Sequence, residues 1–327
     1  MKILITGITG FVGSHMADYI LASQPDVVMH GLVRWRSPMD NVKHIPAGKL
    51  NIHYGDLHDL SSLITVMKEV KPNFIFHLAA QSYVLTSFSA PVDTLQTNII
   101  GTTNLLEAVR ITGVDPVIHI CSSSEVYGQV KPEEVPITEE CPLRPASPYA
   151  VGKVGEDMIA FQYWTSYGIK TIRTRMFTHT GPRRGEVFAL SNFAKQVAAM
   201  EVGLQPIVVK VGNLDSVRTW ADVRDAVKAY WLLVNKCPPG EVYNIGGVET
   251  MTIGEMLKLL LSFSKVSNIK IEVDPARLRP SDVTLQIPCT DKFTKVTGWK
   301  PEIKFEKTVE DTLNYWRDYF RKEGHLK

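Results

Sequence analysis

The sequence predicts an α/β protein built around a doubly wound parallel sheet, with a smaller C-terminal α/β lobe. Three observations predict this fold class. Short β-branched runs alternate with segments of helical apolar periodicity, the connections between them are short, and a glycine-rich turn joins the first strand to the first helix. The chain has 327 residues, which is enough to bury a full core in one large domain and a lobe.

The composition is that of an ordinary globular protein, and it excludes several classes of function. It is 44% apolar and 21% charged, and 36 basic residues against 34 acidic ones predict no nucleic-acid partner. No apolar run reaches the ~18 residues that span a membrane. A strand begins at residue 2, so we expect no signal peptide and a cytoplasmic protein without a membrane partner. The 4 cysteines lack ligand spacing, which predicts reduced thiols and no metal site.

Residues 2–6 form the first predicted strand, which runs into a glycine turn and then into a helix through residue 22. This is the context of a dinucleotide-binding fingerprint. We expect Gly7 to allow the tight turn, Gly10 to let the backbone approach a pyrophosphate, and Gly13 to let helix and strand pack closely. The helix N-terminus then offers free N–H groups to the phosphates. The alternative is an ordinary glycine-rich turn of an α/β protein.

The second predicted strand, residues 27–33, ends in a basic loop. A site for NAD places a carboxylate here to hold the ribose 2′-hydroxyl. Arg34, Arg36 and Ser37 stand there instead, and they suit a 2′-phosphate through charge-assisted hydrogen bonds. The loop therefore predicts NADP as the cofactor, with a solvated basic loop as the alternative.

The following segments continue the alternation. A strand over 51–56 precedes a helix that Asp59 caps. In a buried strand over 74–80 we expect His77 to be a satisfied core histidine, and the small Ala79-Ala80 end to leave room for the cofactor. The next predicted elements are a helix over 92–110, a strand over 117–122 and a helix from residue 148.

Two of these elements carry a candidate catalytic group. Tyr149 and Lys153 are four residues apart and therefore lie on one face of a helix. If both are desolvated, the Lys153 cation favours the phenolate and makes Tyr149 a usable base. Ser123, on the preceding strand, would hydrogen-bond a substrate hydroxyl or carbonyl. Many solvated helices contain such a pair by chance, but with the glycine turn and Ser123 it predicts hydride exchange with NADP.

Glu125 follows Ser123 by two positions and therefore lies on the same face of an extended segment. An enzyme that only moves a hydride at a hydroxyl needs no second base. An enzyme that removes a proton from the carbon beside a newly formed ketone does need a second base. Glu125 is the candidate for it, acting first as base and then as acid. The alternative is that Glu125 only packs or binds the substrate.

Beyond residue 175 the alternation loosens, and we expect the remaining segments to alternate between the main sheet and the lobe. Thr252 and Glu255 predict the capping box of a helix that ends near residue 264, and an amphipathic helix over 305–320 closes the chain. The other expected elements are strands over 173–177, 208–211 and 241–245 and helices from 187 and over 222–235.

Motifs along nearly the whole chain resemble the extended short-chain dehydrogenase/reductases, in their nucleotide-sugar branch, and most of all the GDP-mannose 4,6-dehydratases. The dehydratase-like motifs are the GxxGxxG turn, 34–37, 53–57, 123–125, 144–149 and Pro182-Arg183-Arg184-Gly185-Glu186. The segments 211–214, 222–225 and 278–281 resemble the related GDP-4-keto-6-deoxymannose reductases. There are two departures from the dehydratase pattern, since Thr178 replaces the usual Asn and Ser123 the usual Thr. The chain is also somewhat short for that family.

The resemblance implies a division of the chain and an assembly. An NADP-binding Rossmann domain would span 1–176, with 212–248 returning to it, and a nucleotide-sugar-binding lobe would comprise 177–211 and 249–327. The protein would be a homodimer or a homotetramer. Asn98 would help to organise the active site.

The resemblance also implies a reaction, the 4,6-dehydration of a GDP-mannose-type sugar through an internal NADP redox cycle. Tyr149 would be the base at O4, and Glu125 the base and acid at C5 and C6. The alternatives are an NADPH-dependent GDP-4-keto-6-deoxymannose reductase, a nucleotide-sugar epimerase and a non-catalytic NADP sensor. The sequence leaves open the base of the nucleotide and whether the sugar is a hexose or a heptose.

The predicted site residues form three groups. The catalytic residues are Ser123, Glu125, Tyr149 and Lys153. The cofactor-binding residues are Gly7, Thr9, Gly10, Phe11, Val12, Gly13, Arg34, Arg36, Ser37, Asp56, Leu57, Leu78, Ala79, Ala80, Tyr149, Lys153, His179 and Arg184. The substrate-binding residues are Ser82, Ser123, Ser124, Glu125, Thr178, Lys195, Arg218 and Arg279.

Two arginines of the substrate group are candidates for binding the diphosphate of the nucleotide. Arg218 and Arg279 carry guanidinium forks that suit a dianion, and Lys195 would assist them. Each of the three is equally well interpreted as a surface charge. Arg184 and Glu186 could instead brace the cofactor loop.

Overall fold

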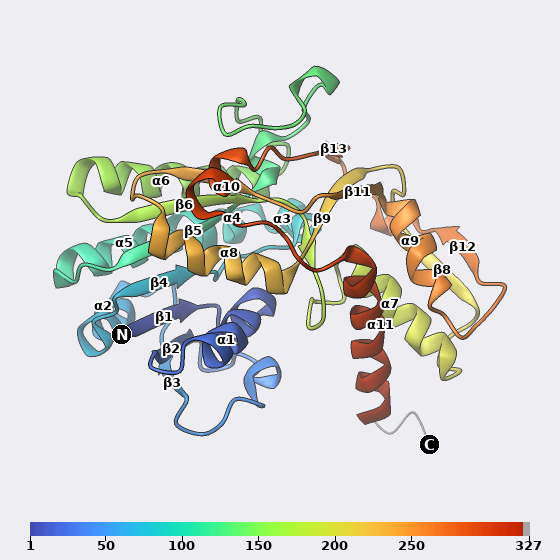
Figure 1. Cartoon of the computed structure of the whole chain (residues 1–327), viewed down its shortest axis with the longest axis horizontal. Helices are drawn as coiled ribbons and strands as arrows, with labels where there is room; N and C mark the ends of the chain where they lie inside the picture. The colour runs from blue at the N-terminus through green and yellow to red at the C-terminus, as the bar shows by residue number, and fades with distance from the viewer. Residues whose placement is uncertain (323–327) are drawn as a thin grey trace.

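Seven parallel strands form the main sheet of the computed structural model, which describes residues 1–322 (Figure 1). Their order is β10-β6-β5-β4-β1-β2-β3, and all neighbouring pairs run parallel. This confirms the predicted fold class. Because the order reverses between β1 and β4, a crevice is expected at the carboxyl ends of these strands. The strands are β1 (Lys2–Thr6), β2 (Val28–Val33), β3 (Leu50–Tyr54), β4 (Phe74–His77), β5 (Val117–Ser123), β6 (Thr171–Met176) and β10 (Val242–Ile245).

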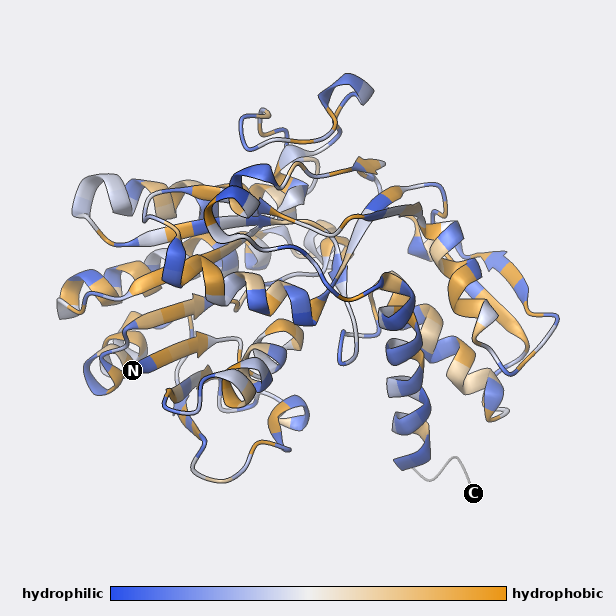
Figure 2. Cartoon of the chain, in the orientation of Figure 1, coloured by the Kyte–Doolittle hydropathy of each residue, from blue (hydrophilic) through white to orange (hydrophobic). Residues whose placement is uncertain are grey.

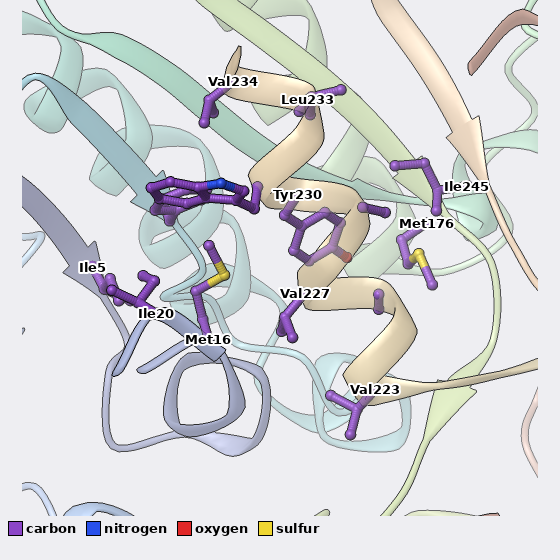
Figure 3. Packing of buried hydrophobic residues seen from close by; sticks show 14 of the residues in the cluster. Ile5, Met16, Ile20, Met176, Val223, Val227, Tyr230, Leu233, Val234 and Ile245 are labelled. Atoms are coloured by element: carbon purple, nitrogen blue, oxygen red, sulfur yellow. The ribbon is translucent and has the colours of Figure 1, made fainter. Parts of the chain in front are cut away.

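Helices cover both faces of this sheet. One hydrophobic cluster packs α1 and α8 on the sheet, and another packs α2, α5 and α6 on the opposite face. Figure 3 shows the first cluster, with Val227 and Tyr230 of α8 facing Met16 and Ile20 of α1. The helices are α1 (Phe11–Ser23), α2 (Leu60–Val70), α5 (Gly101–Thr112), α6 (Pro148–Tyr167) and α8 (Val223–Lys236), with the short α3 (Val84–Ser89), α4 (Pro91–Leu95) and α10 (Asp291–Thr297) around them.

Local signals in the sequence begin and end helix α6, which carries the candidate base. The Ser147 hydroxyl accepts a hydrogen bond from the Ala150 amide, and Pro148 occupies the first helical turn, where its missing N–H is not needed. Gly168 ends the helix in the left-handed conformation. The helix therefore starts where the sequence predicts.

A second layer of elements lies beyond the main sheet, on the right of Figure 1. Helices α7, α9 and α11 enclose a hydrophobic cluster of their own, and the predicted capping box at Thr252 and Glu255 begins α9. Strand β9 (Val217–Asp222) is the central strand of a small sheet. It pairs with β7 (His179–Thr180), β11 (Glu249–Thr252) and β13 (Leu285–Gln286). The remaining elements are α7 (Ala189–Glu201), α9 (Ile253–Ser262), α11 (Phe305–Lys322), β8 (Val208–Val211) and β12 (Lys270–Val273).

The proposed division of the chain into two domains stays a prediction. Within residues 212–248, which were predicted to return to the Rossmann domain, strand β10 joins the main sheet and helix α8 packs on it. Strand β9 of the same segment instead belongs to the small sheet. The predicted range of the lobe also extends over residues 323–327, which lie outside the described residues.

Two differences from the predicted elements matter for the site. The expected helix over 92–110 contains a π-helical segment, Gln96–Ile100, between α4 and α5. The expected strand over 74–80 ends at His77, because the Thr6 hydroxyl accepts hydrogen bonds from the amides of Leu78 and Ala79 and turns the backbone there. His77 is a satisfied core histidine, as predicted, with one ring nitrogen 2.8 Å from the Thr6 hydroxyl and the other 3.0 Å from that of Thr102.

The strands of the main sheet are largely hydrophobic, while the surface helices mix both kinds of residue (Figure 2). None of the helices within residues 1–322 is both long and apolar enough to cross a membrane.

Candidate active site

The glycine turn between β1 and α1 is shaped by steric contact. Gly7 has φ +70°, in the left-handed region, and a Cβ there would lie 2.9 Å from the Ala79 amide nitrogen. A Cβ on Gly13 would lie 2.3 Å from the Gly7 carbonyl oxygen. Both positions therefore require glycine for the reasons that the sequence suggested.

A Gly13→Ala variant is expected to be less stable by about 1–3 kcal/mol, because the added methyl forces α1 away from β1. It should also bind NADPH more weakly, since the turn cannot keep its shape. Thermal unfolding and a fluorescence titration measure the two effects. Gly254→Ala is the matched control, because its Cβ would find no atom nearer than 3.5 Å. Equal unfolding midpoints for the two variants would contradict this role of Gly13.

A first cavity of ≈ 660 Å³ opens at the carboxyl ends of β1 to β6. Almost all predicted cofactor residues line it. They are Gly7, Thr9, Gly10, Phe11, Val12, Gly13, Arg34, Ser37, Asp56, Leu57, Leu78, Ala79, Ala80, Tyr149, Lys153, His179 and Arg184. Arg36 does not line the cavity: both arginines of the loop after β2 are exposed, but only Arg34 reaches the cavity wall.

Arg184, in the Pro-Arg-Arg-Gly segment, supplies a partly buried cation to this cavity. The Arg184 guanidinium lies between the rings of Phe11 and Phe188, 5.0 and 4.0 Å from their centroids. It donates a hydrogen bond to the carbonyl oxygen of His179, whose ring stacks on Phe11. Burial lowers the pKa of Arg184 to about 10, so it stays charged at neutral pH. A partly buried cation without a carboxylate partner among residues 1–322 suits an anionic ligand.

Tyr149 and Lys153 lie one turn apart on α6, at the floor of the cavity. Burial raises the pKa of Tyr149, while the charge of Lys153 and a hydrogen bond with Ser123 lower it. The effect that we predicted for Lys153 is therefore present, but burial outweighs it, and Tyr149 is a neutral phenol at neutral pH. Lys153 donates hydrogen bonds to the Cys121 carbonyl oxygen at 2.8 Å and to Glu156 at 2.7 Å.

A second cavity of ≈ 680 Å³ adjoins the first and reaches toward α7 and the loop before β13. All predicted substrate residues line it, namely Ser82, Ser123, Ser124, Glu125, Thr178, Lys195, Arg218 and Arg279. Ser123, Tyr149 and Arg184 line both cavities. The predicted catalytic serine and tyrosine therefore lie where a ligand of one cavity would meet a ligand of the other.

Glu125 enters the second cavity from a short 3₁₀ helix, Ser124–Tyr127, because β5 ends at Ser123; the prediction that both residues lie on one extended segment was wrong. The Ser123 hydroxyl accepts a hydrogen bond from the Glu125 amide at 3.2 Å, which fixes the two residues relative to each other. The Glu125 carboxylate lies 3.9 Å from Arg279. An acid, a phenol and a hydroxyl thus converge on one space.

The charged side chains across the cavity form a network around Asp282, which the sequence analysis did not single out. The Asp282 carboxylate lies 3.5 Å from Arg279 and 3.6 Å from Arg218. Arg218 also donates hydrogen bonds to the carbonyl oxygens of Val217 and Val283. Lys195 is paired with Glu186. The three predicted cations are thus held by acids or carbonyls at the wall of one cavity and are not scattered over the surface.

Other residues of the site were missed because nothing marks them in the sequence. Phe188 lines both cavities and stacks on Arg184. Gln81 lines the first cavity and exchanges backbone hydrogen bonds, of 2.9 and 3.0 Å, with the side chain of Asn98 in the π-helical segment. Asn98 therefore holds the loop after β4, and a π-segment is a frequent marker of functional sites. No cluster of three or more His, Cys, Asp or Glu side chains in the described part of the chain could hold a metal ion.

This fold and this site define an extended short-chain dehydrogenase/reductase. A parallel sheet with a glycine turn, a Tyr–Lys pair on the helix after β5 and a serine at the end of β5 carry the assignment. The chain belongs to the GDP-mannose 4,6-dehydratase family, whose model matches residues 4–312.

Relatives of this chain carry two different activities in their names. It is 33% identical to the GDP-6-deoxy-D-mannose reductase of Pseudomonas aeruginosa, covering 98% of this chain and 99% of that protein. It is 34% identical to the GDP-mannose 4,6-dehydratase of Yersinia enterocolitica, covering 95% of this chain and 92% of that protein. The solved structure of Pseudomonas aeruginosa RMD complexed with NADPH superimposes with a TM-score of 0.83 at 31% identity, over 97% of this chain and 99% of that one.

Proposed function

We propose that this protein catalyses the 4,6-dehydration of a GDP-mannose-type nucleotide sugar through an internal NADP redox cycle. The observation that carries the proposal is the position of Glu125. It lines the second cavity beside Ser123, and Ser123 and Tyr149 line the boundary between the two cavities. A site with both a proton acceptor for a hydroxyl and a separate carboxylate for a carbon acid has what dehydration requires.

The residues of the first cavity fit a dinucleotide. The N-terminus of α1 follows Gly10 and has no side-chain cap, so its amides are available to a pyrophosphate. Arg184 adds a partly buried positive charge, and Arg34 and Ser37 after β2 suit the 2′-phosphate of NADP. When bound there, NADP supplies the acceptor and donor of a hydride.

An Arg34→Ala variant is expected to bind NADP about tenfold or more weakly and NAD with unchanged affinity, because only NADP carries the phosphate that the guanidinium would pair with. Equilibrium titration with each cofactor measures the change. Arg36→Ala is the matched control and should leave both affinities unchanged, since Arg36 lies outside the cavity. An equal loss for the two cofactors in the Arg34→Ala variant would refute the 2′-phosphate assignment.

The first step that these residues support is removal of the proton from the sugar 4-hydroxyl. Ser123 holds this hydroxyl, and Tyr149, in its phenolate form, takes the proton while the hydride leaves C4. Burial opposes ionisation of Tyr149, so the step depends on the two groups that favour the phenolate, the Lys153 ammonium and the Ser123 hydroxyl. Lys153 itself stays protonated, since its pKa is raised.

The second step is assigned to Glu125. Once C4 is a ketone, the proton on C5 is acidic, and the Glu125 carboxylate removes it and passes a proton to the departing 6-hydroxyl, which leaves as water. The hydride then returns to C6, and Glu125, after taking up a proton from solvent, protonates C5, while the proton that Tyr149 took from O4 is released to solvent. No net oxidation occurs, so the cofactor can stay bound throughout.

The nucleotide diphosphate is assigned to Arg218 and Arg279. Arg218 is buried, and burial lowers its pKa, which Glu125 and Asp282 oppose. A diphosphate would add two negative charges beside the two guanidinium groups. Because Arg279 also lies 3.9 Å from Glu125, substrate binding there would draw Arg279 away from the catalytic carboxylate.

A second candidate function is the NADPH-dependent reduction of a GDP-4-keto-6-deoxy sugar. The observation in its favour is the relative from Pseudomonas aeruginosa, which matches this chain over 99% of its own length and is called a reductase. Such a reductase would use Ser123, Tyr149 and Lys153 in the same way but would not need Glu125.

Two incubations separate these functions. Purified protein loaded with NADP is given GDP-mannose without added NADPH, and the product is weighed by mass spectrometry. A dehydratase yields a product lighter by one water. A reductase leaves GDP-mannose unchanged and instead oxidises one NADPH for each molecule of 4-keto-6-deoxy sugar supplied.

We also propose that the protein is a homodimer or a homotetramer. Several large apolar side chains on α4, the π-helical segment and α6 are exposed, among them Val92, Ile100, Val151, Met158 and Phe161. Apolar side chains gathered on neighbouring helices are typical of surfaces that pair with another subunit.

A further inference from the structure

We propose that Glu156 is a positioning residue of the active site, which keeps the Lys153 ammonium charged and in place at the first cavity. The inference rests on the proposed use of Tyr149 and Lys153. The Lys153 Nζ atom donates a hydrogen bond to the Glu156 carboxylate at 2.7 Å and another to the Cys121 carbonyl oxygen at 2.8 Å. Both side chains are buried, with exposed fractions of 6% and 1%.

A buried ammonium needs a counter-charge, and among the described residues Glu156 forms its carboxylate ion pair. The next acid along α6, Asp157, is not available for this role. Its two oxygens accept hydrogen bonds from Arg173 and Arg175, each at 2.8 Å. The two arginines therefore already neutralise the charge of Asp157, and Glu156 neutralises the charge of Lys153.

Apart from Asp157 and its two arginines, the titratable groups around the pair carry no charge near neutral pH. They are Tyr149 on α6, Cys121 and His119 on β5 and His77 on β4. Burial lowers the pKa of His77 and His119 to about 3, and it raises the pKa of Cys121 and Tyr149. Nothing else on these elements can replace the charge of Glu156.

The ionisation of the pair follows from its burial. Burial lowers the pKa of Lys153, but the Glu156 carboxylate, Tyr149 and Cys121 together raise it, with Glu156 the strongest of the three, and the net shift is upward. Burial also raises the pKa of Glu156 to about 7, and Lys153 opposes that rise. The carboxylate is thus present above neutral pH, where an uncompensated buried lysine would begin to lose its proton.

The test is the pH dependence of NADPH binding, because Lys153 lines the cofactor cavity and binding requires no turnover. NADPH dissociation constants are measured by fluorescence from pH 6 to pH 9 for the unsubstituted protein and for Glu156→Gln, which keeps the shape of the side chain and removes its charge. We expect similar affinities at pH 6, where Glu156 is itself protonated. By pH 9 the variant should bind about tenfold or more weakly, the factor that corresponds to one pKa unit.

Two further variants control the comparison. Glu156→Asp keeps the charge and should follow the pH dependence of the unsubstituted protein. Glu201→Gln removes another buried carboxylate, paired with Arg317 at 2.7 Å and remote from both cavities, and should change NADPH affinity at no pH. A Glu156→Gln curve that runs parallel to that of the unsubstituted protein would overturn the inference.

The remaining outcomes are also decisive. If Glu156→Gln does not fold, the double variant Lys153→Met/Glu156→Gln is made. Recovered folding supports the inference, since the uncompensated cation was then the cause, and continued failure to fold overturns it. If the unsubstituted protein binds no NADPH, both the proposed function and this inference are wrong. If it binds NADPH tightly but the Glu156→Gln and unsubstituted curves are parallel, only the inference is wrong.

Discussion

A Tyr149→Phe variant is expected to lose about 10²–10⁴-fold in kcat, because the sugar 4-hydroxyl then has no group to accept its proton. NADPH affinity should change little, since the ring that lines the cavity remains. Steady-state rates with GDP-mannose and a titration with NADPH measure the two quantities. The loss should appear in kcat and not in KM, as expected for an interaction made in the transition state.

The matched control for this variant is Tyr163→Phe. Tyr163 lies on the same helix, its hydroxyl donates a hydrogen bond to Glu107, and it lines neither cavity. It should retain nearly full kcat. If Tyr149→Phe and Tyr163→Phe were equally active, Tyr149 would not be the proton acceptor.

A Glu125→Gln variant is expected to lower the rate of dehydration by about 10²–10⁴-fold while leaving oxidation at C4 intact. The amide cannot take the C5 proton, but Ser123 and Tyr149 are unaffected. With GDP-mannose, the absorbance of the reduced cofactor should therefore rise and persist. Stopped-flow absorbance and mass spectrometry of the products follow the two stages separately.

Glu186→Gln is the control for Glu125→Gln, because Glu186 lines the same cavity but is paired with Lys195. It should change kcat by only a few fold. Unchanged dehydration by Glu125→Gln would show that this carboxylate only packs or binds substrate. Loss of C4 oxidation together with dehydration would show that it acts in the first step.

The main sheet and the cofactor cavity could be predicted because their signals are local. The glycine turn requires φ +70° at Gly7 and close contact at Gly13, and such demands leave glycine at fixed spacings in the sequence. Tyr149 and Lys153 were paired by helical spacing alone. The net effect on the pKa of Tyr149 was not predictable, since it depends on how completely α6 is buried.

The rest of the site depends on contacts between distant segments. Arg279 lies beside Glu125 although 154 positions separate them in the numbering, and Asp282, in the loop before β13, meets Arg218 of β9 although 64 positions separate them. The small sheet around β9 was missed because its strands are short and come from four separate segments. The role of Glu156 was not predictable either, because the sequence does not show that its side chain is buried beside Lys153.

The most direct test of the proposed dehydration uses GDP-mannose that carries deuterium at C4, with no added NADPH. The internal redox cycle predicts a product lighter by one water, in which the deuterium has moved to C6 of the same sugar. Mass spectrometry with fragmentation, or NMR, locates the label. Recovery of unchanged substrate, or of a product with the mass of the substrate, would contradict the proposal.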